Sequence, residues 1–541
     1  MARIRFAAGV LLGAAVLRLL TSNGLVNYDT LYTLVWGREL AHGTLPNLEV
    51  AIAPTPHPLS TLGAMLLSPL SSLRIDGLYG ELAAATVVAL AYVSLALLGW
   101  VVFALGRAWF NTAAGALAAA IVLTRVPVLD FGARAYVDIP YLVLVLGALL
   151  VETRRPRAGP SVLALLALAG LLRPEAWLFS AAYLAWLLAP GVRAAARAAG
   201  GAGALGRAAG GGGAGGGASG GIARRSAGGA GAAGAAGAGR PTRTTGTTAA
   251  RTAPRPSAAL LDALPLLALA ASAPLLWCLH DLLITGNALH SLTGTRDNAV
   301  TLGRVTGLQH VPLTLPRRIG EILREPVLLA AAGGGLLALA WHRDRRTRLA
   351  VAAGLAAVVA FCVLAAAGLP IITRYVLLPG TLLSIFAGAG AFGWLDLRRG
   401  SPQRTWWARF GALALVVLLV YVPSQARRID RLASALNRQE SIQGDLARVV
   451  RDGVPCEPVA VPNRRPIPLL ALWLEIEPGD VVDAQAAAAV PPRGTYLVPR
   501  TPRVARDYIL DSRDRDRRVA PAPAGFARAR SSASWIASTR C

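Results

Sequence analysis

The chain has 541 residues, of which 54% are hydrophobic and only 15% are charged, and its mean hydropathy is +0.51. This composition is too apolar for a soluble globular protein and predicts an integral membrane protein. The net charge is +25 because 54 basic residues, all of them arginine, outnumber 29 acidic residues. They gather in the connections between apolar segments, where arginine sets membrane orientation, and this placement argues against a nucleic-acid partner.

Apolar segments of about 17 to 25 residues recur along the chain, each long enough to cross the hydrocarbon layer as a helix. The first, at 1–20, begins with two arginines and is not followed by a small-x-small cleavage site, so we expect a spanning helix instead of a signal peptide. Further spans are expected at 81–105, 111–128, 137–153, 159–173, 175–190, 259–283, 326–341, 349–369, 375–395 and 408–423. The predicted fold class is an all-α polytopic membrane protein with about eleven transmembrane helices.

The arginines also predict the orientation of these helices in the cell membrane. If the N-terminus is cytoplasmic, the connections that follow the even-numbered spans face the cytoplasm, and each of them is net basic. An odd number of spans then places residues 424–541 outside the cytoplasm. The loops at 21–80, 129–136, 284–325 and 370–374 lie on the same outer side.

Composition divides the chain into four regions. Two transmembrane modules, 1–190 and 257–423, flank the Ala/Gly-rich tract 191–256, which contains arginine but no acid and which we interpret as a disordered cytoplasmic linker. Residues 424–541 alternate arginine-rich stretches with short apolar runs, and this pattern predicts a small extracytoplasmic α/β domain.

Two of the four cysteines, Cys456 and Cys541, fall in this outer region. An extracytoplasmic location permits a disulfide between them, but sequence carries no geometry, so the pairing is left open. The other two, Cys278 and Cys362, lie in apolar segments and are expected to be core residues.

The stretch "NYDTLYTLVWGRELAHG" in the first outer loop has helical character and carries an unusual acid, Asp29, close to Tyr28, Tyr32 and Trp36. A carboxylate beside aromatic rings is a common way to hold a sugar. The alternative is that Asp29 caps the helix while the aromatic residues form an interfacial belt.

Other ionisable residues fall on the outer side, where their placement near the membrane makes them functional candidates. Each has an ordinary alternative: a turn residue, a helix cap, a local ion pair, or an arginine that reaches toward lipid headgroups. The candidates are His57 in "PTPHPL", Arg134 and Asp138 in "ARAYVDIP", Arg173 and Glu175 in "LLRPEAW", and Arg374 and Tyr375 in "ITRYVLLPG".

Taken in order, these motifs resemble the C-type glycosyltransferases, polytopic membrane enzymes that use polyprenyl-phosphate-linked sugars. The resemblance is strongest to the branch of protein O-mannosyltransferases and lipid A aminoarabinose transferases, and it covers about residues 1–423. "YDT…GRELAHG" with "PTPHPL" resembles the family's first outer loop, and "RAYVDIP", "LRPEAW" and "RYVLLP" resemble its later motifs. Thr30 departs from the family, which often has a second acid at this position.

The resemblance implies transfer of a sugar from a polyprenyl-phosphate donor to a glycan, lipid or protein acceptor, with inversion. Asp29 matches the catalytic acid position and is expected to act as the general base, with Asp138 orienting the acceptor or holding a divalent cation. Whether Mg²⁺, Mn²⁺ or Ca²⁺ is needed stays open. The expected phosphate-binding residues are Arg173 and Arg374, then Arg134 and His57, and the expected sugar or acceptor contacts are Tyr28, Tyr32, Trp36, Glu175 and Tyr375.

Two other classes of protein are alternatives. A transporter or flippase of lipid-linked sugars also needs polar groups at membrane depth, but the sequence shows no paired broken helices or inverted repeat. A non-catalytic scaffold for envelope assembly would keep the fold without activity, and the departure at Thr30 keeps this alternative open.

Overall fold

The computed structural model describes residues 1–48, 50, 52–189, 256–486, 490–510 and 518–541. All but the last residue of the predicted linker 191–256 therefore lies outside the described residues. The chain divides into two units. The first is Met1–Leu184 with Leu266–Cys541, and the second is Ala185–Pro265. The helices Glu175–Ala189 and Pro256–Thr285 continue from the first unit into the second, and all other elements discussed below lie in the first.

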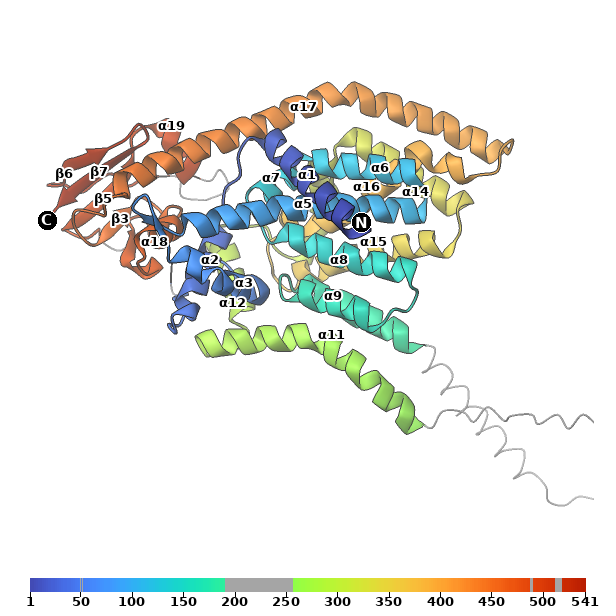
Figure 1. Cartoon of the computed structure of the whole chain (residues 1–541), viewed down its shortest axis with the longest axis horizontal. Coiled ribbons are helices and arrows are strands. Elements are labelled where there is room, and N and C mark those ends of the chain that lie inside the picture. The colour runs from blue at the N-terminus through green and yellow to red at the C-terminus, as the bar shows by residue number, and fades with distance from the viewer. Residues whose placement is uncertain (49, 51, 190–255, 487–489, 511–517) are drawn as a thin grey trace, which may run out of the picture. The chain divides into compact units, whose positions relative to one another are not determined.

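The described part of the chain is mostly helical (Figure 1), and each predicted apolar segment contains a helix. The N-terminal half contains α1 (Ala2–Thr21), α2 (Tyr28–Ala41), α3 (Pro58–Leu66), α4 (Ser68–Ser71), α5 (Glu81–Trp109), α6 (Thr112–Thr124), α7 (Val126–Ala133), α8 (Asp138–Arg154) and α9 (Pro160–Gly170). A short hairpin of β1 (Arg74–Ile75) and β2 (Leu78–Tyr79) precedes α5. The C-terminal half contains α11 (Pro256–Thr285), α12 (His290–Thr301), α13 (Val311–Leu323), α14 (Glu325–Trp341), α15 (Arg345–Ala366), α16 (Leu377–Phe392) and α17 (Pro402–Val450).

Among the described residues, six helices are long and apolar enough to cross a membrane, which confirms a multi-pass membrane protein. Two pairs of helices bent at a short break, by 63° and 107°, raise the number to eight if each pair is one span. Among the described residues, fewer than the predicted eleven helices are long and apolar enough to cross a membrane. The spans expected at 137–153, 159–173 and 175–190 coincide with shorter helices, Asp138–Arg154, Pro160–Gly170 and Glu175–Ala189.

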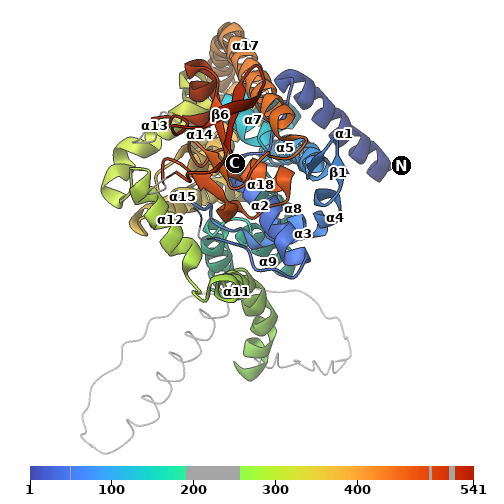
Figure 2. The same ribbon diagram turned by 90° about the vertical axis from the view of Figure 1, so that its left-hand side faces the viewer.

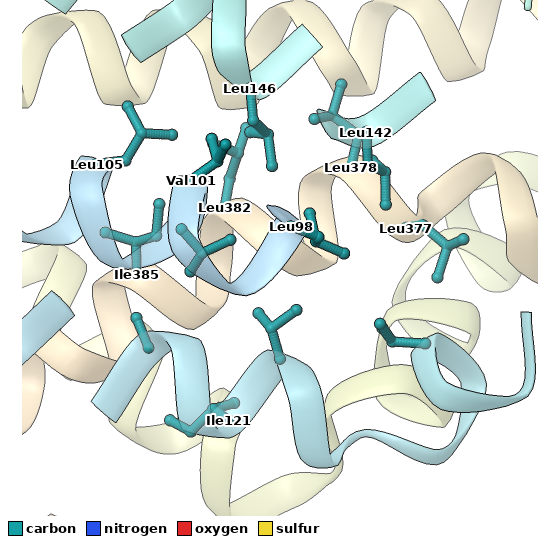
Figure 3. Close-up of a cluster of buried hydrophobic side chains, with 14 of the residues drawn as sticks. Leu98, Val101, Leu105, Ile121, Leu142, Leu146, Leu377, Leu378, Leu382 and Ile385 are labelled. Atoms are coloured by element: carbon teal, nitrogen blue, oxygen red, sulfur yellow. The ribbon is translucent and has the colours of Figure 1, made fainter. Parts of the chain in front are cut away.

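The core of the helical part is built around α16, which packs against α5, α6 and α14. Leucine and isoleucine side chains from α5, α6, α8 and α16 converge there (Figure 3). Small residues allow the backbones to approach closely: a Cβ atom on Gly388 would lie 2.2 Å from the carbonyl oxygen of Ala114 on α6. Such close approach is a typical basis of helix association in membranes, where lipid and leucine are equally apolar.

The C-terminal part contains a five-stranded mixed sheet, in line with the predicted α/β domain. Its strand order is β4 (Val481–Asp483), β3 (Val459–Val461), β5 (Gly494–Pro499), β7 (Trp535–Arg540) and β6 (Ala527–Ser531), with the first three strands parallel. The helix α18 (Ile467–Leu474) connects β3 to β4, and short helical turns, including α19 (Pro502–Val504), follow β5. A disulfide joins Cys456 to Cys541, so the pairing left open by the sequence is present.

The helix α17 connects the helical part to this sheet (Figure 1). It contacts α14 and α16 along its first half and β7 near its end. The predicted domain boundary at residue 423 lies inside this helix. Trp535 of β7 is fully buried, and its indole N–H donates to the carbonyl of Ile442 on α17 at 2.9 Å.

The segment 21–80 and the C-terminal part share one hydrophobic cluster, to which α2, α17, α18 and the sheet contribute (Figure 2). Arg38 of α2 is 4% exposed and donates to the carbonyl oxygens of Ala471 and Leu472, both at 3.1 Å. These carbonyls belong to the last turn of α18, where a cation is favoured because helix carbonyls there have no partner within the helix. Arg38 therefore stabilises the contact between α2 and the C-terminal part.

Replacing Arg38 with alanine should destabilise the protein by about 2–3 kcal/mol, because two buried carbonyls lose a charged donor. Thermal unfolding of the purified protein in detergent measures the effect. Arg107→Ala, a change at an exposed arginine, is the control and should leave the unfolding midpoint unchanged. Equal unfolding midpoints for the two variants would show that Arg38 does not stabilise the contact between α2 and the C-terminal part.

Candidate active site

The first turn of α2 is held in place by Asn27. Its side-chain oxygen accepts from the backbone amides of Asp29 and Thr30, at 2.8 and 3.1 Å, and its amide nitrogen donates to the carbonyls of Arg134 and Ala135. Asn27 is therefore the N-cap of this helix, and the alternative in which Asp29 caps it is wrong. The carboxylate of Asp29 is left available for another partner.

That partner is Arg374, which lies 345 residues further along the chain, immediately before α16. Nη1 of Arg374 donates to Oδ2 of Asp29 at 3.0 Å. The two side chains are 25% and 28% exposed, so the ion pair is accessible from outside. A ligand can replace one partner of an accessible ion pair more readily than one partner of a buried pair.

A second charged cluster, fully buried, lies at the start of α8. Arg173 contacts Asp138 through Nη1 and contacts Glu175 through Nε and Nη2, the latter at 2.6 Å from Oε1. The exposed fractions of the three residues are 4%, 1% and 5%. The other oxygen of Asp138, Oδ2, is buried and accepts no hydrogen bond from the described residues.

The ring of Tyr375 connects the two clusters. The guanidinium carbon of Arg173 lies 4.5 Å from the ring centroid, and that of Arg374 lies 5.8 Å from it. Both distances are within the range of cation–π contact. The structure therefore brings together Asp29, Asp138, Arg173, Glu175, Arg374 and Tyr375, which the sequence placed in separate loops.

His57 borders the same site. It occupies the N-cap position of α3, and its ring packs edge-on against Trp277 of α11, with centroids 5.7 Å apart. Burial, followed by the positive charges of Arg374 and Arg173, lowers the pKa of His57 to about 3. The imidazole is therefore neutral at physiological pH, and it would contact a phosphate as a hydrogen-bonding group and not as a cation.

Three predicted residues have other partners. The guanidinium of Arg134 contacts Asp130 at 2.7 Å and also Gln439 of α17. Tyr32 and Trp36 are 0% and 1% exposed and pack in the cluster shared with the C-terminal part. Their rings have no exposed face with which to cover a sugar.

Tyr28 is half-buried beside them, and its hydroxyl donates to the carbonyl of Ile52 at 3.3 Å. Of the three aromatic residues in this helix, it is the one with surface left for a ligand. Thr30 donates to the carbonyl of Ala135 at 2.9 Å. Thr30 thus has a structural role at the start of α2.

The donors at the site do not suit a resident metal ion. Among the described residues there is no group of three or more His, Cys, Asp or Glu side chains positioned to hold one. The carboxylates of Asp29 and Asp138 are each contacted by an arginine, Arg374 and Arg173 respectively. We therefore assign no catalytic step to a divalent cation.

Sequence reasoning missed Asn27 and Tyr136. The preference of asparagine for helix N-termini is a signal that could have identified the first. Tyr136 has no such signal. It is close enough to the site for the charge of Asp29 to raise its pKa, after burial, which is the larger cause.

No protein-family profile matches the chain, and no curated protein does so. Among solved structures, the chain is similar to the crystal structure of ArnT from Cupriavidus metallidurans bound to undecaprenyl phosphate. The sequence identity is 14% and the TM-score is 0.49, with 99% of this chain and 97% of that chain covered. At this low similarity, function has to be inferred from the side chains themselves.

The lowered pKa of His57 predicts how acid affects stability. Protonation is disfavoured in the folded protein, so the stability associated with neutral His57 is complete above its ordinary pKa of about 6.5 and is lost as the pH falls toward 3. The difference in unfolding midpoint between wild type and His57→Gln should be constant above about pH 7 and should change in favour of the variant on acidification to about pH 4. A difference independent of pH over this range would contradict the assignment.

Proposed function

We propose that the protein is a membrane glycosyltransferase that moves a sugar from a polyprenyl-phosphate donor to an acceptor in the cell envelope, outside the cytoplasm. One observation carries the proposal: Arg173 and Arg374 both lie against the ring of Tyr375, and the second of them is ion-paired with Asp29. The site thus combines two guanidinium groups for a phosphate with a carboxylate able to take a proton.

The location of these residues suits a lipid-linked substrate. Arg374 lies at the start of the apolar span Thr373–Asp396, and Asp138 begins the apolar helix α8. Charged groups at the ends of apolar helices lie at the membrane surface. A donor phosphate can bind there while its polyprenyl chain stays in the bilayer.

Phosphate binding would exchange the partner of Arg374. Arg374 makes a single 3.0 Å contact with Asp29. With a phosphate, the same guanidinium can form two parallel hydrogen bonds. Arg173 is already held in position by Asp138 and Glu175. Donor binding would draw Arg374 toward the phosphate and release the carboxylate of Asp29.

The released carboxylate would then act as the general base. The acceptor hydroxyl attacks the anomeric carbon, a carbon–oxygen bond forms, and the proton passes to Asp29. The bond from the anomeric carbon to the phosphate oxygen breaks, and its electron pair leaves with the polyprenyl phosphate, whose charge the two arginines stabilise. A single displacement inverts the configuration at this carbon.

Asp138 would orient the acceptor. Its Oδ1 contacts Arg173, while its buried Oδ2 has no donor among the described residues. A buried carboxylate oxygen without a partner is costly, and a substrate hydroxyl would satisfy it. Glu175 holds Arg173 from the other side. Tyr28 and Tyr375 are the aromatic residues that we expect to contact the sugar or the acceptor.

Asp29→Asn should lower transfer about 1,000-fold, because asparagine cannot accept the proton. The measurement is turnover by the purified protein with a panel of polyprenyl-phosphate sugars, followed as transfer or as hydrolysis. Asp297→Asn, at an exposed acid on α12, is the matched control and should retain wild-type turnover. Wild-type turnover in Asp29→Asn would refute the assignment of the base, and inactivity of wild type with every donor would favour a scaffold.

Arg374→Gln should lower the catalytic efficiency with the donor, because the phosphate loses a positively charged group that can form two hydrogen bonds with it. We expect kcat/KM for the donor to fall about 100-fold or more, consistent with the loss of charged hydrogen bonds. Arg317→Gln, at an arginine with a 78% exposed side chain, provides the control. Equal values for the two variants would mean that Arg374 does not contact the donor phosphate.

A further inference from the structure

Arg125 is a buried arginine that the proposed transfer does not use. It is 6% exposed and occupies the 63° bend between α6 and α7. Its guanidinium donates to the carbonyls of Ile121 and Leu323, both at 3.2 Å, and to the hydroxyl of Thr124 at 3.3 Å. These contacts use three of the five N–H groups of a guanidinium, and all three acceptors are neutral. They hold the side chain in place but supply no counter-ion for its charge.

A second arginine, Arg428 of α17, lies close to the first. The two helices meet where the side-chain amide of Gln425 donates to the carbonyl of Thr124 at 2.6 Å. Arg428 is less than one turn beyond Gln425 on the same face of α17. Because a helical side chain leans toward the N-terminus of its helix, the half-buried guanidinium of Arg428 points back toward this contact. The charges of Arg125 and Arg428 are near enough to repel each other.

This repulsion between the two arginines is not offset by an acid. Among the described residues, no carboxylate is within ion-pair distance of Arg125 or Arg428, and Arg428 forms no hydrogen bond with them. The hydroxyl of Tyr421, one turn before Gln425, is buried and also has no partner in the described part of the chain. Buried polar groups normally have partners, so the contact between α6 and α17 has unused donors for an anion.

The same contact borders surface that faces the bilayer. Ala116 and Ala120 precede Thr124 by two turns and by one turn on one face of α6, and both are exposed. On α17, Val420 is 76% exposed and is the neighbour of Tyr421. Both helices belong to the apolar membrane-spanning part, so these exposed side chains contact lipid. An acyl chain can therefore lie against them, on the side of the two arginines that faces the middle of the membrane.

The two arginines lie at the depth of lipid headgroups. The apolar run of α17 ends at Pro423, and the sequence "SQARRIDR" that follows it is polar. Three arginines and one aspartate make this stretch net basic, which favours a headgroup with net negative charge over a zwitterion. A guanidinium can form two parallel hydrogen bonds with the phosphate of such a headgroup.

We propose that the contact between α6 and α17 binds one anionic phospholipid, with its phosphate at Arg125 and Arg428 and an acyl chain along the exposed residues of both helices. The proposal is independent of the transfer reaction, which uses none of these residues. The lipid would supply the counter-ion that Arg125 lacks. It would bind where the two bent pairs of helices meet, because Arg125 lies at the first bend and Leu323 ends the helix before the second.

The experiment is native mass spectrometry of the full chain released from nanodiscs that contain equal parts of phosphatidylglycerol, phosphatidylethanolamine and phosphatidylcholine. Wild type should retain one phosphatidylglycerol, in at least about tenfold excess over the other two lipids. Arg428→Gln should lower this retention about tenfold, since charge-assisted hydrogen bonds with the phosphate are lost. Arg427→Gln, at an exposed arginine on another face of α17, is the matched control and should retain the lipid as wild type does.

Two further variants locate the bound lipid. Ala120→Trp should also lower retention, because the indole occupies the surface where the acyl chain lies. Arg374→Gln removes a cation of the candidate active site and should leave retention unchanged. Added inorganic phosphate should not displace the adduct, since a free anion lacks the acyl chain. Equal retention of the three lipids by wild type, equal retention by Arg428→Gln and Arg427→Gln, loss of the adduct in Arg374→Gln, or displacement by inorganic phosphate would each overturn the proposal.

Discussion

The burial of the Arg173 guanidinium is the constraint on which the site depends. An arginine that is 4% exposed at the end of apolar helices is tolerated only with close partners, because an unpaired charge there would cost several kcal/mol. Asp138, Glu175 and the ring of Tyr375 supply these partners from three segments of the chain. Satisfying one buried charge thus fixes the start of α8, the turn before residue 175 and the start of α16 relative to one another.

The Asp29–Arg374 pair depends on this arrangement from one side and on the C-terminal part from the other. Tyr375 places Arg374 next to Arg173, while Asn27 and the cluster around Tyr32 and Trp36 set the direction of α2. The aromatic residues near Asp29 therefore position the carboxylate through packing, whereas the sequence suggested that they hold a sugar. The buried Asp138–Arg173 pair is shielded from a competing ligand, whereas the Asp29–Arg374 pair, with side chains 28% and 25% exposed, is accessible to one.

At the site around Tyr375, two arginines can face a single phosphate, which suits a monoanionic or dianionic donor. Asn27 holds the first turn of α2 beside this site, because its side chain joins the amides of Asp29 and Thr30 to the carbonyls of Arg134 and Ala135.

The sequence by itself determined the membrane class, the positions of the apolar helices and the candidate charged residues, because hydropathy and charge are local properties that need no partner. It could not determine that Tyr32 and Trp36 are buried in the cluster shared with the C-terminal part, or that Arg134 contacts Gln439. These facts depend on contacts between residues far apart in the chain. Only the tertiary structure decided which arginine meets which carboxylate, since ion pairing at a membrane surface follows from the packing of whole helices and not from spacing along one of them.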